Sequence, residues 1–429
     1  MRRFYKQAGL IAAFMIALYF SGCSPKVDKE ITNTSVINTA HLDALYGEKN
    51  VGGQTVGIIH IYAEYPDYHL MGDDDEGIAC VDDASRAAIF YLRHYQNTSD
   101  EEHLRKGRML IKFLLAMQSP NGYYYNFIWP DGTIHTDGIT SKPEPAFWSW
   151  RTLWAMGEAI NILDQNDSLV LQMKQQRELL AGNMLRETSF KSKGTDTTMG
   201  WSFPMWLPKV SGTDQASIVL IGLSFMLQQQ YEGSRIDKDS LEAFMEHFAD
   251  GITLMQIEQP DSLHDGAFLS WENLWHAYAN IQSYALLTAG EVLNDPHITA
   301  HALYEIDHFY PAFLQAGGLE HFYVRVENGK ITRYDTKAYS QIAYGRRPMI
   351  WASLKAYEIT KDEKYLSLAK ELGVWFSGTN PANTPMYDPS TGRGYDGISS
   401  PEQINKNSGA ESTIESLLAL QALEKYIDN

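Results

Sequence analysis

The sequence is poor in cysteine and in positive charge. Only two cysteines occur among 429 residues, and 35 Lys and Arg residues stand against 53 Asp and Glu residues, giving a net charge of -18. Nucleic acids and anionic membrane surfaces are bound by basic faces, so neither is expected as a partner. A neutral substrate, or one bound by local arginines, remains open.

Several sequence motifs of catalytic sites are also missing. No H-E-x-x-H, paired C-x-x-C, glycine-rich phosphate loop or G-x-S-x-G occurs, so a zinc hydrolase, a nucleotide enzyme and a serine esterase are unsupported. The acidic run Asp73 to Glu76 lacks the D-x-D-x-D-G spacing of an EF-hand, which leaves a solvated loop, a funnel lining or a calcium site as alternatives. We expect neither a metal nor a cofactor.

The one long apolar run lies at the N-terminus, in MRRFYKQAGLIAAFMIALYFSGCS. At about 14 residues it is short for a bilayer span, and basic residues precede it, as in a secretory signal peptide. The small residues before Cys23 resemble a bacterial lipobox, which predicts a signal peptide over 1–22, lipidation of Cys23 and a tether over 23–33. Plain secretion and a retained anchor are the alternatives. The lipoprotein would be anchored in the cell envelope, touching the membrane only through its lipid, and Cys80 would have no disulfide partner.

Apolar residues at spacings of three and four predict a chain made almost entirely of helices. The expected helices are 34–47, 82–96, 100–118, 148–163, 167–187, 214–231, 238–257, 271–293, 297–315, 340–359, 362–377 and 410–427. Segments rich in charge and surface amides alternate with segments that are apolar on several faces. This alternation is typical of outer and inner helices in a layered ring.

The connections alternate as well. Links from apolar to polar helices are short, whereas links from polar to apolar helices are long, as in 119–147 and 378–409. Long structured loops are normally functional, and here all would gather at the N-termini of the apolar helices. The pattern predicts an all-α (α/α)6 toroid over 34–429, monomeric, with short β-hairpins in its loops. GLEHFYVRV (318–326) and GKITRYDT (329–336) are expected to form such a hairpin. An open solenoid of helix pairs is the alternative.

Paired carboxylates stand at the start of the first inner helix, in VDDASRAA (81–88). Asp82 and Asp83 occupy the expected N-cap and first turn, where a carboxylate is stabilised by the helix dipole. Capping needs only one of them, and Arg86, one turn on, is placed to hold the second in its ionised form. A catalytic or substrate-binding role therefore competes with capping alone.

A third carboxylate opens the last inner helix, in NKNSGAEST (405–413). Ser408 and Glu411 match an S-x-x-E capping box. In a closed ring the first and sixth inner helices are neighbours, so Glu411 would face the aspartate pair. A protonated and an ionised carboxylate together are what inverting glycoside hydrolysis requires. We expect Asp82 or Asp83 as base and Glu411 as acid, an assignment that could be reversed.

WFSGTNP (375–381), MYDPSTGRGYDG (386–397) and NKNSGAEST, together with the hairpin number, resemble the six-hairpin glycosidase superfamily. In its family-nine cellulases, a W-x-x-G-x-N-P stretch precedes the helix with the acid glutamate, and an aspartate pair activates water. VDDASRAA also resembles the DDNARA segment of helical-toroid domains in bacterial carbohydrate operons. The resemblance implies a carbohydrate-active toroid; the cellulase D-A-G-D motif is absent here.

Aromatic and polar residues in the long loops are candidates for holding a glycan. The expected substrate-binding residues are Arg86, Tyr124, Trp129, Trp150, Arg151, Trp201, Trp206, Trp271, Glu272, His321, Arg325, Arg346 and Asn407. Each loop pairs a ring for stacking with a polar group for a hydroxyl, although individually most tryptophans belong in a core. A glycoside hydrolase is the leading interpretation. A lyase or epimerase acting on a uronic-acid glycan, served by His321 and the arginines, and a non-catalytic glycan-binding lipoprotein are the alternatives.

Overall fold

The computed structural model describes residues 35–229 and 234–426. The predicted signal peptide, Cys23 and the tether lie outside these residues and stay predictions. Residues 36–429 form one compact unit. In the described part of the chain, no helix is both long and apolar enough to cross a membrane.

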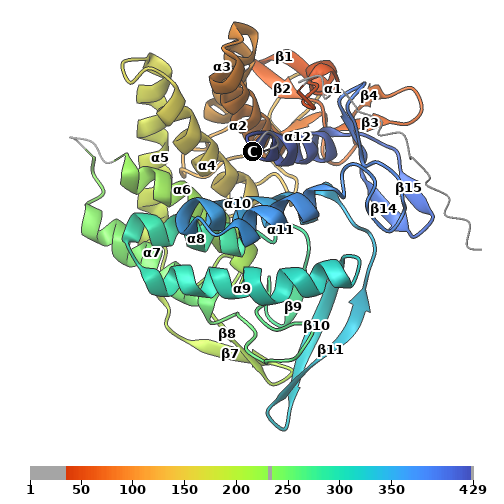
Figure 1. The fold of residues 1–429 in the computed structure, drawn as a ribbon. Helices are drawn as coiled ribbons and strands as arrows, with labels where there is room; N and C mark the ends of the chain where they lie inside the picture. The colour runs from red at the N-terminus through yellow and green to blue at the C-terminus, as the bar shows by residue number, and fades with distance from the viewer. Residues whose placement is uncertain (1–34, 230–233, 427–429) are drawn as a thin grey trace, which may run out of the picture. The chain divides into compact units, whose positions relative to one another are not determined.

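Six helices form a closed inner ring (Figure 1). They are α2 (Val81–Thr98), α4 (Phe147–Ile162), α6 (Thr213–Gln228), α8 (Gln282–Leu293), α10 (Arg347–Thr360) and α12 (Ala410–Glu424). Each contacts the next along the chain, and α12 contacts α2. The contact between the last and the first inner helix confirms the toroid and excludes an open solenoid.

The outer helices are α3 (Glu101–Ala116), α5 (Ser168–Arg186), α7 (Lys238–Thr253), α9 (Pro296–Gln315) and α11 (Glu363–Gly373), with the short α1 (Ala40–Leu45) against α12. The first five all begin at an aspartate N-cap whose carboxylate accepts a first-turn backbone N–H. Such caps fix where a helix starts. The predicted helix 34–47 ends early because residues from Tyr46 onward pair as β1 with β2, a hairpin that packs on α3.

Short strands occupy the long loops. They are β1 (Tyr46–Val51), β2 (Gln54–Ile59), β3 (Tyr62–Glu64), β4 (His69–Met71), β5 (Ala79–Cys80), β6 (Phe127–Ile128), β7 (Thr195–Thr198), β8 (Trp201–Pro204), β9 (Leu274–His276), β10 (His321–Glu327), β11 (Lys330–Lys337), β12 (Tyr387–Asp388), β13 (Arg393–Gly394), β14 (Gly397–Ser400) and β15 (Gln403–Asn405). All pairings between them are antiparallel. The predicted hairpin is confirmed as β10–β11.

Two inner helices start later than predicted. Residues 271–281 are not helical, because β9 pairs with β10 and brings Trp275 onto Phe322 in a stacked contact at 5.2 Å. Residues 340–346 hold an extended stretch and a 3-10 turn before α10 begins. Pairing between segments distant in sequence overrides the local helical pattern in both places.

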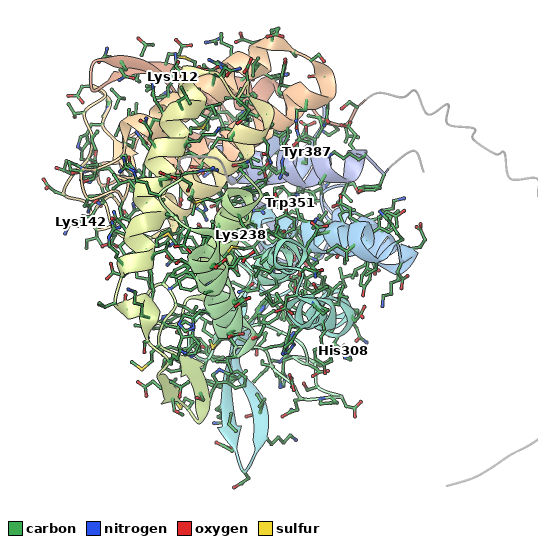
Figure 2. All side chains as sticks on the ribbon, turned by 90° about the vertical axis from the view of Figure 1, so that its left-hand side faces the viewer. Lys112, Lys142, Lys238, His308, Trp351 and Tyr387 are labelled. Carbon is green, nitrogen blue, oxygen red and sulfur yellow. The ribbon has the colours of Figure 1, made fainter. Side chains whose placement is uncertain are left out.

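The core lies within the inner ring and between the two rings. Trp154 of α4 meets Trp351 of α10 edge to face at 5.7 Å, and both are nearly fully buried. Trp351 lies in the interior, whereas His308 of the outer helix α9 lies at the periphery (Figure 2). The inner helices are therefore buried on several faces, as their composition predicts.

Glu305, a buried glutamate of α9 outside the centre of the ring, connects α9 to α8 and to the loop before α8. Glu305 accepts hydrogen bonds from the Ser283 hydroxyl at 2.7 Å and from the Phe268 backbone N–H at 3.0 Å. Burial raises the pKa of Glu305 to about 7 from its usual 4.5. The folded chain therefore binds this proton more tightly than the unfolded chain does.

Replacing Glu305 with glutamine is expected to remove a pH dependence of stability. In the wild type, the stabilisation from the raised pKa is complete below the unfolded pKa and is lost as pH rises through about 7. Relative to Glu305→Gln, the wild type should lose roughly 2 kcal/mol of unfolding free energy between about pH 5 and pH 7. Urea denaturation of both proteins across this range measures the difference. Parallel stability curves would contradict the expectation.

Candidate active site

Five of the six inner helices, all except α2, have no side-chain cap, and backbone groups of the long loops bond to several of the N-termini. Val81 of α2 donates its backbone N–H to the Asn126 carbonyl at 2.8 Å. Thr213 of α6 donates to a loop carbonyl at 2.9 Å, and Ala410 of α12 donates to the Ile61 carbonyl, also at 2.9 Å. The loops are therefore anchored over the same end of the ring, where first-turn acids are favoured by the helix dipoles.

The aspartate pair lies in the first turn of α2, but neither aspartate is the N-cap. Cys80 takes that position, and its sulfur accepts the backbone N–H of Asp83 at 3.4 Å. The Cys80 thiol in turn donates to Oδ2 of Asp83 at 3.2 Å. The expectation of an aspartate N-cap is wrong because the β5–β6 pairing already fixes the chain at Cys80. Both carboxylates are consequently available for other contacts.

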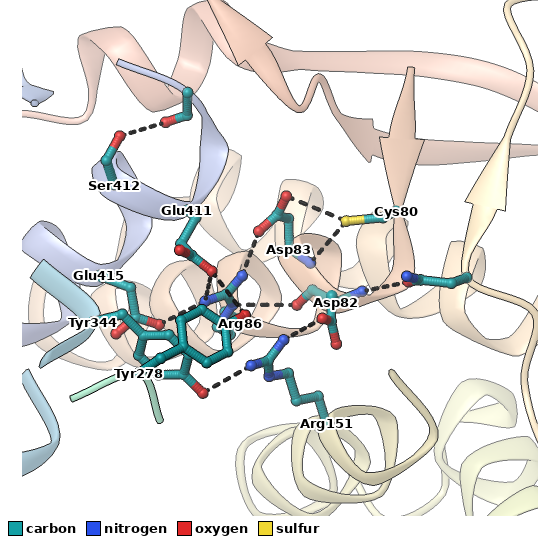
Figure 3. Close-up of polar contacts among 12 residues, drawn as sticks. Cys80, Asp82, Asp83, Arg86, Arg151, Tyr278, Tyr344, Glu411, Ser412 and Glu415 are labelled. Atoms are coloured by element: carbon teal, nitrogen blue, oxygen red, sulfur yellow. Dashed lines mark hydrogen bonds and ion pairs between the residues drawn. The ribbon is translucent and has the colours of Figure 1, made fainter. Parts of the chain in front are cut away.

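Arg86 of α2 lies at the centre of a network of carboxylates (Figure 3). Its Nη2 donates to Asp83 Oδ1 at 2.5 Å, and its Nη1 donates to Glu411 at 3.1 Å and to Glu415 at 2.9 Å. The Arg86 side chain is only 2% exposed. Because Glu411 and Glu415 belong to α12, this one guanidinium joins the two helices at which the ring closes. The structure thus brings Glu411 to the aspartate pair, as ring closure predicts.

Two further arginines complete the network. Arg347 of α10 donates to both oxygens of Glu415, at 2.6 and 3.2 Å. Arg151 of α4 forms an ion pair with Asp82, and its Nη2 donates to the Tyr344 hydroxyl at 2.8 Å. Every arginine here therefore pairs with at least one carboxylate.

Glu411 is the most exposed carboxylate of the network, with 36% of its side chain accessible. The Tyr278 hydroxyl donates to Glu411 Oε2 at 3.3 Å. The predicted capping box is wrong: the N-cap of α12 is Gly409, and the Ser408 hydroxyl donates to the Gly394 carbonyl instead. Ser408 is fully buried, and its hydroxyl also lies 3.2 Å from that of Thr413 in the first turn, but it caps no backbone N–H of the helix. Glu411 is thus free of any capping role.

The carboxylates differ in how easily they ionise. Burial raises the pKa of Glu411 and the pKa of Asp83, although Arg86 opposes both shifts. Burial also disfavours ionisation of Glu415, but Arg347 and Arg86 outweigh it and lower the pKa of Glu415. Glu411 is therefore suited to hold a proton, whereas Glu415 serves as a buried counterion for the arginines.

A cavity of about 310 Å³ opens beside this network. It is lined by Ile61, Tyr62, Ala63, Glu64, Asp83, Ile342, Ala343, Tyr344, Asp396, Asn407, Gly409, Glu411 and Ser412. The residues come from β3, the start of α2, the turn before α10 and the loop into α12. Its size is at the small end of ligand pockets, and it combines aromatic rings with carboxylates.

The acidic loop from Asp73 to Glu76 supports this cavity indirectly. Asp73 Oδ1 accepts the backbone N–H groups of Asp75 and Glu76, which closes an exposed turn. Glu76 accepts the hydroxyl of Tyr62 at 2.6 Å, and Tyr62 lines the cavity. Within residues 35–229 and 234–426, no group of three or more His, Cys, Asp or Glu side chains is arranged to hold a metal ion.

The predicted site residues divide into two groups. Those that meet at the network or its cavity are Asp82, Asp83, Arg86, Arg151, Asn407 and Glu411. The rings of Tyr124 and Trp150 have no exposed surface, and their polar atoms bond to Gln176 and Gln215. These two rings offer no face to a sugar and belong to the core.

The other predicted rings also lie apart from the network. Trp206 is 5% exposed and stacks on His247, and Trp201 is 9% exposed on β8. Trp129 packs against His135 at 4.3 Å. Trp271 is exposed, and its indole N–H donates to the Lys209 carbonyl at 3.0 Å.

The remaining polar residues predicted to bind substrate already have partners. Arg346 is buried on the ring of Phe313, and burial lowers its pKa to about 9. Arg325 lies on the exposed hairpin over Tyr334. The remaining two are His321, 3.3 Å from Glu320, and Glu272, which accepts from Thr198 at 3.4 Å. Arg346 and Arg325 do not line the cavity.

Sequence reasoning missed Tyr278, Tyr344, Asp396 and Glu415. Glu415 had a detectable signal, because a glutamate in a helix predicted to be buried requires a cation, and it stands one turn after Glu411. Tyr344 lies in AYGRRPMIW beside Arg347, but nothing in that stretch indicates that the ring faces Arg151 and Arg86 at about 5 Å. These contacts depend on ring closure.

No protein-family model matches the sequence, and no curated protein does. The fold is similar to a sugar epimerase from a ruminal bacterium, with a TM-score of 0.59 and 12% identity over 91% of this chain and 96% of that one. It is also similar to a cellobiose 2-epimerase from Bacillus thermoamylovorans, with a TM-score of 0.59 and 16% identity over 90% of this chain and 95% of that one.

A GH76 α-mannanase from Bacteroides thetaiotaomicron has a TM-score of 0.51 and 11% identity over 82% of this chain and 87% of that one. Identities this low show a shared fold and nothing finer. The resemblance to the six-hairpin enzymes is confirmed at that level: the chain has their (α/α)6 toroid.

Proposed function

We propose that the protein is a glycoside hydrolase in which Glu411 is the general acid and Asp82 the general base. The observation that carries the proposal is the position of Glu411: a carboxylate with a raised pKa at the wall of a cavity, joined through Arg86 to Asp83, the neighbour of Asp82. A carboxylic acid with a raised pKa is suited to protonating a leaving-group oxygen.

The choice of Asp82 over Asp83 rests on their contacts. Asp83 has both oxygens engaged, one with Arg86 and the other with Cys80, and its side chain is 5% exposed. Asp82 pairs through Oδ2 with Arg151, and its Oδ1 is buried without a hydrogen-bond partner, while 18% of the side chain as a whole is exposed. A buried oxygen without a partner would gain a hydrogen bond from a water molecule bound beside it, so we assign Oδ1 as the acceptor of that water's proton. Asp83, although it touches the cavity, is proposed as a positioning residue.

The proposed reaction follows from these roles. Glu411 transfers its proton to the glycosidic oxygen as the bond from that oxygen to the anomeric carbon breaks. Asp82 accepts a proton from a water molecule, whose oxygen forms the new bond to the anomeric carbon. Two exposed rings, Tyr62 in the cavity wall and Tyr278 beside Glu411, supply faces for a sugar.

A carbohydrate substrate is proposed also because the similar structures include an α-mannanase and two epimerases. Sugar epimerisation is a second candidate function, and a separate contact in the structure favours it. His276 on β9 lies 3.4 Å from Asp214 in the first turn of α6, and its ring is 6.3 Å from that of Tyr278. A histidine so placed is a base for abstracting a proton beside a carbonyl. Epimerisation would leave the glycan length unchanged.

Amide substitutions of the two aspartates test the base assignment. Asp82→Asn is expected to lower kcat by roughly 10²- to 10⁴-fold with little change in glycan binding, because the amide cannot take the proton from water. Asp83→Asn keeps the shape of the Arg86 contact and should lower kcat less. The rate at which new reducing ends are released from a panel of oligosaccharides measures kcat for both variants. Full activity of Asp82→Asn would overturn the assignment, and no release by the wild type would overturn the proposed function.

Removing the Tyr278 hydroxyl should shift the pH profile. The hydroxyl stabilises the ionised form of Glu411, so Tyr278→Phe raises the pKa of Glu411 further. A hydrogen bond to a charged group contributes about 1.5 kcal/mol or more, so the alkaline limb of kcat should move up by about one pH unit. Tyr62→Phe, whose hydroxyl bonds to Glu76 instead, is the control and should leave the limb in place. Equal profiles for all three proteins would contradict the acid role of Glu411.

A further inference from the structure

The cavity beside Glu411 is lined by four carboxylates and by no arginine or lysine. The four are Glu64, Asp83, Asp396 and Glu411. Asp83 and Glu411 share Arg86, which lies beneath them and is almost fully buried. The only charge that the side chains of this wall can carry is therefore negative.

Glu64 and Asp396 belong to the cavity but not to the arginine network. Asp396 accepts the Ser412 hydroxyl at 2.9 Å and the Asn405 amide at 3.2 Å, and both partners are neutral. Burial raises the pKa of Asp396, and the charge of Glu64 adds to the shift. Lys406 follows Asn405 in the chain, but its ammonium lies over the ring of Tyr65, which is not part of the cavity wall.

The three arginines of the network are buried, and each is already paired with a carboxylate of the protein. Their nitrogens without a hydrogen-bond partner, such as Arg347 Nη1 and Arg151 Nε, are buried as well, and none of the three arginines lines the cavity. Arg86 serves Asp83, Glu411 and Glu415; Arg347 serves Glu415; and Arg151 serves Asp82. The network thus contains three arginines and four carboxylates, and the carboxylates are those of Asp82, Asp83, Glu411 and Glu415. A uronate needs a cation, normally a bidentate arginine, to offset the loss of its hydration. In this cavity its carboxylate would instead meet acids.

We propose that the cavity selects glycans without negative charge, neutral or amino-bearing, and rejects uronic acids and sulfated sugars, with Glu64 and Asp396 as specificity residues. The inference rests on the proposed function, because it concerns the same site. A uronate carboxylate in this cavity would lose hydration and gain no cation, because the wall contains no arginine or lysine. Oxidation of a bound sugar to its uronate should therefore weaken binding at least about tenfold.

The test uses Glu411→Gln, whose amide mimics the protonated acid and prevents turnover. The probes are oligomers of glucose, mannose, galactose and their amino forms, each matched with its counterpart oxidised to the carboxylate at C6. Calorimetric titration at low salt gives both Kd values of each pair. The expected result is that every binding pair favours the uncharged member at least about tenfold. A pair that binds equally, or that favours the uronate, overturns the inference.

A charge substitution at Glu64 tests whether this residue causes the preference for uncharged glycans. Glu64→Arg places a cation in the wall and should shift the ratio of uronate to neutral affinity at least about tenfold toward the uronate. Glu402→Arg makes the same change in net charge at an exposed residue outside the cavity and should leave the ratio unchanged. An equal shift in both variants overturns the role of Glu64.

The outcomes separate the inference from the proposed function. Hydrolysis by the wild type with a preference for uronates would overturn the inference alone. Preference for uncharged glycans without any hydrolysis would overturn the proposed function alone. Binding of no probe by Glu411→Gln would overturn both.

Discussion

Replacing Glu411 with glutamine is expected to lower kcat on unactivated glycans by roughly 10²- to 10⁴-fold. The amide has the shape of the protonated acid but no proton to give to the leaving oxygen. Binding should change little, because glutamine keeps the size and shape of the acid in the cavity wall. Steady-state rates of reducing-end release, with calorimetric Kd values for the same glycan, measure the two effects.

The leaving group provides the control that distinguishes an acid from a merely structural residue. An aryl glycoside with a strongly acidic phenol departs without protonation, so Glu411→Gln should hydrolyse it nearly as fast as the wild type does. Asp82→Asn should be slow on both substrates, because attack by water is needed in each case. Equal losses of Glu411→Gln on both substrates would rule out proton donation by Glu411.

Replacing Arg86 with methionine is expected to destabilise the folded chain by about 3–5 kcal/mol near neutral pH. The substitution leaves Asp83 and Glu415 buried without this counterion and breaks the link between α2 and α12. Urea denaturation followed by circular dichroism measures the loss.

The deficit should also depend on pH. Without Arg86, the pKa values of Asp83 and Glu411 rise further above their unfolded values, so the folded variant binds protons more tightly than its unfolded chain does. Its stability is therefore greatest at low pH and falls as pH rises through the folded pKa values. Arg105→Met, which removes an exposed arginine paired with Glu48 and Glu102, should cost less than about 1 kcal/mol. A similar small loss for Arg86→Met would contradict the role of the network.

The fold was predictable because its signals are local and repeated. Alternating polar and apolar helices with alternating loop lengths predict two layers, and the aspartates at 100, 167, 237, 295 and 362 mark where outer helices begin. The loop strands were less predictable. The pairing of β9 with β10 depends on contact between segments about 45 residues apart, which no local pattern contains.

The site was predictable only in part, for the same reason. Ring closure brings Glu411 to Asp83, and that followed from the helix order. The positions of Tyr278 and Tyr344 depend on how the loops before α8 and α10 fold back, and the sequence suggests helix there. The burial of Trp150 and Tyr124 likewise depends on packing between the helix layers. The residues next to an aromatic in the sequence do not show whether its ring faces the core or a ligand.

The most direct test of the account is the product that the wild-type protein forms from a neutral oligosaccharide in ¹⁸O-enriched water, read by mass spectrometry within the first minutes. The account predicts shorter oligosaccharides carrying one ¹⁸O at the new reducing end, and none from Glu411→Gln or Asp82→Asn. A product of unchanged length and mass that is isomerised at the carbon next to its reducing end would contradict it.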